Sequence, residues 1–200
     1  MDDGVLGALA EARALGFLGP GPLEAHVASA SAFAEALGPL AGRALDLGSG
    51  GGVPGLLLAE RYGDVAWTLL DVHRRRTSFL ARTVASLGWV GRVDVVRAAA
   101  EVLAHDLLHR GRYTAVTARS FGPPAITAEI AVGFLQLGGL LLVAEPPEDA
   151  PERWPEASLA NLGLRRLPSP TASVAVFRLG RPADVTCPRP WRELERRPAW

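Results

Sequence analysis

The feature that most constrains the fold of this chain is a glycine-rich turn that reads ALDLGSGGGVPG from Ala44 to Gly55. A short apolar strand there contains an acidic residue and runs directly into glycines, with Pro54 near the far end. Glycines let the backbone approach a ligand without side-chain clashes, and the first amides of the following helix have no partner within that helix. The turn therefore predicts a strand, loop and helix that together bind a ligand.

Strand-like and helix-like segments alternate after this turn, which predicts a doubly wound α/β fold with a mainly parallel sheet and right-handed crossovers. The predicted strands are 44–47, 65–70, 93–97, 113–118 and 140–144. The predicted helices between them are 55–62, 73–87, 101–110 and 124–137. After a loop at 145–155, strands at 162–167 and 173–179 are expected to form an antiparallel terminal hairpin. The crevice at the carboxyl ends of the parallel strands is the expected ligand site.

The 200 residues fit one domain, which we expect to span residues 1–180. Two introductory helices, at 3–18 and 22–38, are expected within residues 1–40. From residue 181 the chain is rich in proline and tryptophan and has no apolar period. Residues 181–200 are therefore expected to be either a poorly ordered tail or an arm lying on the surface.

Composition excludes several classes of protein. Cys187 is the only cysteine, so an internal disulfide and a cysteine-based zinc site are excluded. We see no signal-peptide pattern before the first helical segment and no apolar run near the roughly 20 residues that cross a bilayer, so we expect a cytoplasmic protein without a membrane partner. His105 and His109 lack a third ligand nearby, which favours a surface helix face over a metal site, and we expect no metal. The net charge is zero and names no partner.

Two acidic residues favour an adenosine compound as the ligand. Asp71 closes the second strand, where its carboxylate can accept hydrogen bonds from both ribose hydroxyls. A G-x-G-x-x-G pattern beginning at Gly50 also fits a dinucleotide. Asp46, two residues before Gly48, could face a cationic amino group, which S-adenosylmethionine carries and dinucleotides lack. In a simpler interpretation, Asp46 caps the turn and Asp71 caps the helix that begins near His73.

Three segments carry a family resemblance: DLGSGGGVPGLLLA in the glycine turn, LLDVHRRRTSFL from Leu69 to Leu80, and TAVTARSF from Thr114 to Phe121. Together they resemble the bacterial small-subunit ribosomal RNA methyltransferase G family, also known as glucose-inhibited division protein B. The resemblance implies a class I, Rossmann-like methyltransferase fold of seven strands and S-adenosylmethionine as the methyl donor. It further implies transfer to N7 of a guanine in 16S ribosomal RNA, with ribosomal RNA or the 30S subunit as the partner.

Carried onto this sequence, the resemblance places the loop glycines beneath the methionine part of the donor, Asp71 at its ribose and the Ala-Glu pair after the third strand near its adenine. Ser49 and Val72 are assigned to the same site. The candidate cofactor residues are thus Asp46, Gly48, Ser49, Gly50, Gly52, Asp71, Val72, Ala100 and Glu101. Arg119, directly after the fourth strand, is the candidate catalytic residue at the mouth of the site. Its alternative is a strand-end arginine, solvated or paired with a nearby acid. His26 also has a counterpart in the family, although we expect it to have a core or capping role.

Departures from the family pattern leave the acceptor open. Family members usually have an arginine where this chain has Ala99, and a lysine where it has Ala144 and Glu145. The stretch 145–156 holds five acidic residues against Arg153 alone, and such a surface repels phosphates. A methyltransferase for a small molecule or another non-RNA acceptor is therefore the alternative, and a non-catalytic nucleotide-binding module is a third interpretation.

Two arginine-containing segments could replace the missing RNA surface. The run 74–76 opens the helix after the second strand, and the tail combines arginines with Trp191 and Trp200. Arginine with aromatic neighbours suits phosphate binding and base stacking, although a solvated helix face also explains the first segment. All 21 basic residues are arginine, which we attribute to genome composition rather than to selection for bidentate binding. The oligomeric state is not indicated.

Overall fold

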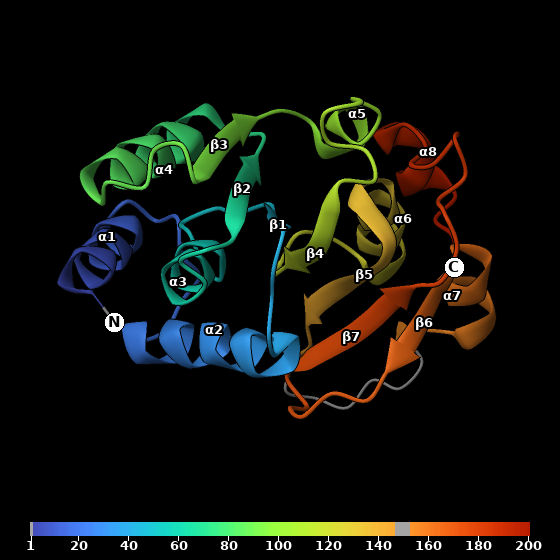
Figure 1. The fold of residues 1–200 in the computed structure, drawn as a ribbon, viewed down its shortest axis with the longest axis horizontal. Helices are drawn as coiled ribbons and strands as arrows, with labels where there is room; N and C mark the ends of the chain where they lie inside the picture. The colour runs from blue at the N-terminus through green and yellow to red at the C-terminus, as the bar shows by residue number, and fades with distance from the viewer. Residues whose placement is uncertain (1, 147–152) are drawn as a thin grey trace.

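The computed structural model describes residues 2–146 and 153–200, and these contain a seven-stranded sheet with helices on both faces (Figure 1). The strands are β1 (Arg43–Leu47), β2 (Ala66–Asp71), β3 (Val93–Arg97), β4 (Tyr113–Ala118), β5 (Leu135–Ala144), β6 (Leu164–Leu167) and β7 (Val174–Leu179). The helices are α1 (Asp3–Ala14), α2 (Leu23–Leu37), α3 (Gly55–Arg61), α4 (Arg74–Ser86), α5 (Ala100–Leu103), α6 (Pro124–Phe134), α7 (Glu156–Asn161) and α8 (Trp191–Arg196). None of the described helices is long and apolar enough to cross a membrane.

The strand order is β3-β2-β1-β4-β5-β7-β6. β1 pairs in parallel with both β2 and β4, whereas β7 lies antiparallel between β5 and β6. This confirms the predicted doubly wound, mainly parallel sheet with an antiparallel terminal hairpin. The order reverses between β1 and β4, and such a switch point opens a crevice at the carboxyl ends of the strands.

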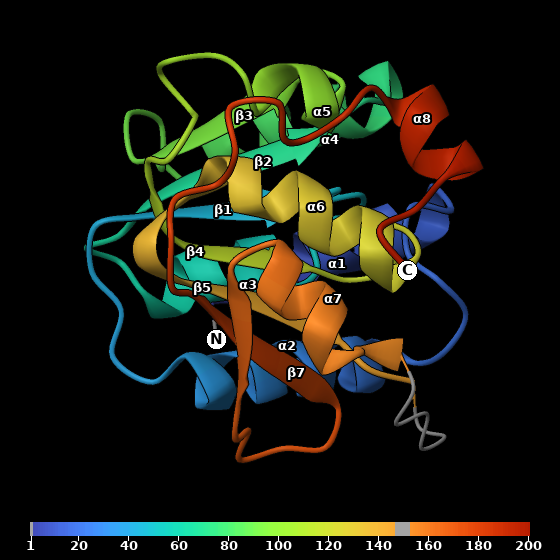
Figure 2. The ribbon, with the colours of Figure 1, turned by 90° about the vertical axis from the view of Figure 1, so that its right-hand side faces the viewer.

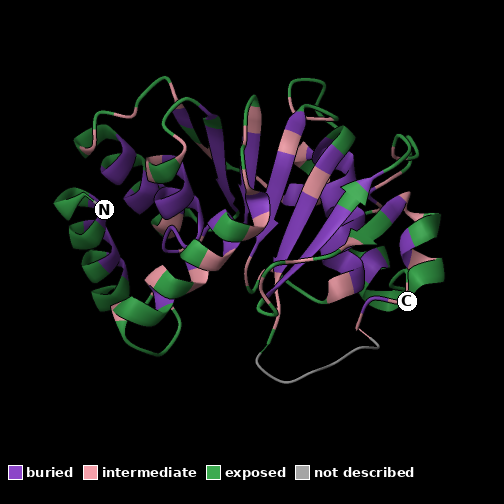
Figure 3. Ribbon diagram, turned by 60° about the horizontal axis from the view of Figure 1, so that its bottom comes forward, coloured by how far each residue is buried: buried purple, intermediate pink, exposed green. Residues whose placement is uncertain are grey.

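Alternation along each strand divides the core into two layers. Leu45 and Leu47 of β1 face the layer formed by α5, α6, α7 and α8, while Ala44 faces the layer formed by α1 to α4. Figure 1 shows the second group of helices on the left and the first on the right. Figure 3 shows buried residues following the strands and exposed residues on the outward faces of the helices. Asp46 shares its face of β1 with Ala44, because successive side chains point to opposite faces.

Three predicted helices are clearly shorter than expected. The helix expected over 101–110 is limited to α5, and the chain continues in turns, where Asp106 Oδ1 accepts a hydrogen bond from the Leu108 amide (2.8 Å). The helix expected over 124–137 ends at Phe134, where β5 begins. The first helix also ends early, before Gly16, whose φ of 71° is left-handed.

Beyond β5, part of the predicted loop at 145–155 lies outside the described residues, and α7 follows it without having been predicted. Residues 181–200, the C-terminal arm, run past α6, contain α8, and return to end beside α6 and α7 (Figure 2). The guanidinium of Arg189 clamps Glu129 of α6, with Nε 2.8 Å from Oε1 and Nη2 2.6 Å from Oε2. Leu194 of α8 is fully buried, so the arm contributes to the core.

A substitution at Gly55, the first residue of α3, tests how tightly this helix packs against β1. A Cβ at this position would lie 2.5 Å from Oδ2 of Asp46 and 2.6 Å from Cδ2 of Leu69, and both side chains are buried. We expect Gly55→Ala to lower the free energy of unfolding by about 1–3 kcal/mol in urea denaturation. Gly63→Ala is the matched control, because a Cβ there meets nothing within 4 Å among the described residues. Equal denaturation midpoints for the two variants would contradict this packing.

Candidate active site

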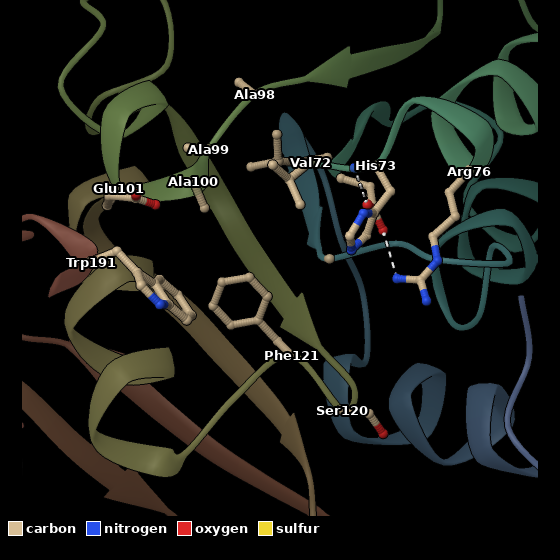
Figure 4. A pocket seen from close by; sticks show the side chains of 13 residues that line it. Val72, His73, Arg76, Ala98, Ala99, Ala100, Glu101, Ser120, Phe121 and Trp191 are labelled. Carbon is tan, nitrogen blue, oxygen red and sulfur yellow. Dashed lines mark hydrogen bonds and ion pairs between the residues drawn. The ribbon is translucent and has the colours of Figure 1, made fainter. Parts of the chain in front are cut away.

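A pocket of about 400 Å³ lies at the carboxyl ends of β1, β2, β3 and β4, at the switch point of the sheet (Figure 4). This volume lies within the range of pockets that bind small molecules. Of the residues predicted from the sequence, the pocket wall contains Gly48, Asp71, Val72, Ala100 and Glu101. The structure thus brings together the first glycine, the acid and the Ala-Glu pair from three separate loops.

The loop glycines adopt backbone conformations that other residues rarely reach. The φ angles of Gly48, Gly50 and Gly52 are 73°, 55° and 94°. A Cβ at Gly48 would also lie 2.7 Å from Cδ2 of Phe121. Ser49 does not line the pocket, because its hydroxyl donates to the backbone carbonyl of Asp46 at 2.9 Å. The loop therefore lines the pocket through Gly48. Its conformation depends on Ser49, Gly50 and Gly52, which do not line the pocket.

Asp71 fastens this loop to the end of β2. Its Oδ2 accepts a hydrogen bond from the Gly50 amide (3.0 Å), and its Oδ1 accepts one from the His73 amide (2.8 Å). Arg76 Nη1 lies 3.6 Å from Oδ2 (Figure 4). Asp71 therefore caps the His73 amide at the start of α4 and also lies on the pocket wall. An ionised carboxylate has about four acceptor sites, so the fixed carboxylate keeps acceptor capacity for a ligand.

Asp46 is buried in the sheet and does not line the pocket. Its Oδ1 accepts a hydrogen bond from Thr117 Oγ1 (2.8 Å), whereas Oδ2 has no partner among the described residues. Burial raises the pKa of Asp46 to about 6, and the hydrogen bond from Thr117 opposes part of this shift. Contact between Asp46 and a ligand amine stays a prediction.

Arg119 is half-buried, and among the described residues its guanidinium hydrogen-bonds to a histidine rather than to an acid. Its Nη1 donates to Nδ1 of His26 (3.1 Å), a buried residue of α2. His26 Nε2 lies 3.2 Å from the carbonyl oxygen of Gly19. Because an arginine can only donate, this contact uses Nδ1 as the acceptor and leaves Nε2 to donate to Gly19. Burial lowers the pKa of Arg119, and the charge of Asp46 opposes this effect. Arg119 does not line the pocket, although the next residue, Ser120, does.

Sequence reasoning missed the aromatic wall of the pocket. Phe121 and Trp191 meet edge to face, with ring centroids 6.1 Å apart and planes at 88° (Figure 4). Phe121 ends the segment TAVTARSF, which carries part of the family resemblance. Its position just after a predicted strand could have indicated a place at the pocket. Trp191 lies far along the chain, and no local pattern places it here. Ser120, with a φ of 55°, is the one non-glycine residue with a left-handed conformation in the described part of the chain.

The charged segments singled out from the sequence are partly engaged in contacts. Glu145 accepts hydrogen bonds from Arg153 Nη1 (2.9 Å) and Trp154 Nε1 (2.7 Å), so it is held inside the protein. The three acidic residues among 147–152 lie outside the described residues. Of the run 74–76, Arg76 approaches Asp71 and Arg75 lies over the ring of Phe17 at 5.7 Å from its centroid. Within the described part of the chain, no three potential ligands gather at a metal site.

The strand order defines the class I methyltransferase fold, and solved structures share it. Geranyl diphosphate C-methyltransferase from Streptomyces coelicolor has a TM-score of 0.57 and 15% identity, over 70% of this chain and 62% of that one. A predicted O-methyltransferase from Agrobacterium tumefaciens has a TM-score of 0.55 and 22% identity, over 77% and 79% of the two chains. Within this fold, the chain belongs to the rRNA small subunit methyltransferase G family, whose sequence model matches residues 23–152.

Individual relatives confirm the family predicted from the sequence. The ribosomal RNA small subunit methyltransferase G of Rubrobacter xylanophilus is 36% identical over 126 residues, which is 62% of this chain and 48% of the relative. The protein of the same name from Prochlorococcus marinus is 34% identical over 158 residues, which is 74% of this chain and 64% of the relative. The matches thus span about half to two thirds of the length of these relatives.

The buried Asp46 gives the protein a distinctive pH dependence of stability. Its pKa rises from the ordinary value of 3.8 to about 6 on folding, so the folded state favours the protonated acid. This contribution is complete below the unfolded pKa and is lost as the pH rises through about 6, on the order of 3 kcal/mol in all. Asp46→Asn, which stays neutral, should match the wild type near pH 4 and exceed its stability above pH 7 in urea denaturation.

Asp64→Asn is the control for this experiment, because Asp64 lies exposed in a turn. It should show no comparable gain at high pH. A difference between Asp46→Asn and the wild type that stays constant with pH would contradict the assignment.

Proposed function

We propose that this protein is an S-adenosylmethionine-dependent methyltransferase that acts on 16S ribosomal RNA, with guanine N7 as the acceptor. The carrying observation is the carboxylate of Asp71, which is fixed to the glycine loop at the wall of the switch-point pocket. The relatives bear the name ribosomal RNA small subunit methyltransferase G, and the Streptomyces coelicolor neighbour was solved with S-adenosyl-L-homocysteine. A ribosomal acceptor implies the 30S subunit as the partner and a cytoplasmic location.

The residues present fit this donor. A pocket of about 400 Å³ with a side-chain-free loop on one wall suits a nucleoside that must lie close to the backbone. We assign Gly48 and its loop to the methionine part and Asp71 to the ribose hydroxyls. Val72, which is 57% exposed, and the Ala100-Glu101 pair are assigned to the adenine. Asp46, with its unpaired Oδ2 beneath the loop, stays the candidate for the amino group, which would require the loop to move.

The chemistry demands little of the protein beyond placement. S-adenosylmethionine, when bound, supplies an electrophilic methyl group. Guanine N7 has a free lone pair at neutral pH, so the attack needs no general base. The pocket therefore acts by orienting the two reactants and excluding water, and orientation can supply several of the roughly 7 to 11 kcal/mol available from positioning. We assign Arg119, held by the ring of His26, to the acceptor side, where its charge can attract phosphate.

One observation favours the alternative of a non-RNA acceptor. Ala99, at the position where the family usually has an arginine, lines the pocket itself. The pocket wall thus lacks a positive charge at that point. The acceptor is consequently the part of the proposal that most needs a direct test.

Donor binding is tested first, with S-adenosyl-L-homocysteine in isothermal titration calorimetry. Asp71→Ala removes the carboxylate assigned to the ribose hydroxyls, and it also removes the hydrogen bond that holds the Gly50 amide. The affinity for S-adenosyl-L-homocysteine should therefore fall at least about 30-fold. Asp94→Ala is the matched control, because Asp94 is an exposed acid on the neighbouring β3 and does not line the pocket. An unchanged affinity for Asp71→Ala would overturn the donor-site assignment.

The acceptor is tested by turnover on 30S subunits from a strain that lacks the corresponding methylation. Methyl transfer should map by mass spectrometry to a guanine of 16S ribosomal RNA. Donor binding without transfer to the subunits would reject the RNA acceptor and leave the small-molecule alternative.

A further inference from the structure

A second pocket lies beside the first, between the start of α6 and the C-terminal arm. Its volume is about 510 Å³. Its walls are mainly flat and apolar, formed by Pro123, Pro124, Trp191, Pro198 and Trp200 together with aliphatic side chains. Among the described residues, Trp191 is the only one that lines both pockets. The C-terminal arm is therefore a common wall between the proposed donor site and a separate aromatic cavity.

The arm holds this cavity in a fixed shape. Glu129 is 2% exposed, and its carboxylate accepts hydrogen bonds from Nε and Nη2 of Arg189 and from the Arg189 amide (3.1 Å). His105 Nε2 lies 2.8 Å from the carbonyl oxygen of Pro188. These contacts fix the chain immediately before Trp191, whose ring then meets Phe121. The wall is thus formed before any acceptor arrives.

The opposite wall is fixed as well. Trp200 Nε1 donates to the carbonyl oxygen of Arg153 (3.0 Å), and the Trp200 ring lies 6.0 Å from that of Trp154. The guanidinium of Arg153 in turn pairs with Glu145 at 2.9 Å. Apart from Arg153 and Glu195, the cavity has no charged wall residue in the described part of the chain. It is therefore suited to the face of a planar ring, and indole faces stack on any nucleobase.

The position of the second cavity limits which part of an acceptor molecule can bind there. The acceptor atom must come within about 3 to 3.5 Å of the reacting methyl carbon, so the methylated group has to enter the donor pocket. A ring in the second cavity is separated from that pocket by Trp191 and cannot be the methylated one. It must belong to an acceptor that extends past Trp191, as a polynucleotide does and a small molecule does not.

We propose that the second cavity binds an unpaired nucleobase of the RNA substrate that neighbours the methylated base, with Trp200 and Trp191 as its aromatic walls. This inference rests on the proposed RNA methyltransferase function. It assigns a substrate-positioning role to the C-terminal arm, and it gives Trp191 contacts with both donor and RNA.

The test compares Trp200→Ala and Trp200→Phe in two assays. Binding of a fluorescently labelled single-stranded oligonucleotide with the sequence around the methylated guanine is measured by anisotropy, and S-adenosyl-L-homocysteine binding by calorimetry. Trp200→Ala should weaken RNA binding and raise the KM for 30S subunits about 10-fold, with kcat and donor affinity unchanged. Trp200→Phe, which keeps a ring, should restore most of the RNA affinity. Trp191→Ala should weaken the binding of both the RNA and S-adenosyl-L-homocysteine.

Trp89→Ala is the matched control, because Trp89 is a half-buried indole that lies against Arg92 and lines neither pocket. The inference would be overturned if Trp200→Ala bound RNA with wild-type affinity or if Trp200→Phe did not restore binding. It would also be overturned if the wild type bound no RNA. An effect of Trp200→Ala on a small aromatic acceptor instead of RNA would overturn it as well. Failure of the inference alone is distinguishable, because the wild type then still binds the donor and methylates 30S subunits. Loss of either property in the wild type is failure of the proposed function.

Discussion

The hydrogen bond from the Gly50 amide to Oδ2 of Asp71 is the contact on which the site depends. It joins the loop after β1 to the end of β2, so two neighbouring strands of the sheet fix one pocket wall. The Asp71 side chain is 4% exposed, and a buried carboxylate is costly unless amides or cations compensate it. Two backbone amides and Arg76 supply that compensation. The pocket is therefore shaped by the same contacts that compensate the burial of Asp71.

A second layer of polar contacts lies behind the loop. Asp46 and Thr117 face each other across β1 and β4, directly paired in the parallel register. Arg119 leaves the end of β4 and is held by His26 of α2. The second introductory helix, α2, thus helps to position the candidate catalytic arginine. On the other side of the sheet the C-terminal arm closes the pocket through Trp191. Elements from both ends of the chain therefore complete a site that the central strands begin.

The sequence predicted the centre of this arrangement better than its edges. Gly48 and Asp71 were predictable because a strand that ends in a glycine turn and a strand that ends in an acid are local signals. Arg119 was placed correctly at the end of its strand, but its partner came from a helix far away in the sequence. The sequence marked Trp191 only as an aromatic residue beside tail arginines, and it did not predict α8. Tertiary contacts such as Arg189 with Glu129 hold this segment in place. The helix expected over 101–110 was too long, because the backbone after Leu103 forms turns that the apolar spacing does not reveal.

Amide hydrogen exchange at Gly50 in the ligand-free protein shows whether Asp71 shapes the pocket before any ligand binds. We expect the Gly50 amide to be protected in the wild type and to exchange much faster in Asp71→Asn, while amides in the β4 core keep their protection. Exchange of Gly50 in the wild type at the rate of an unstructured peptide would show that Asp71 does not hold the loop.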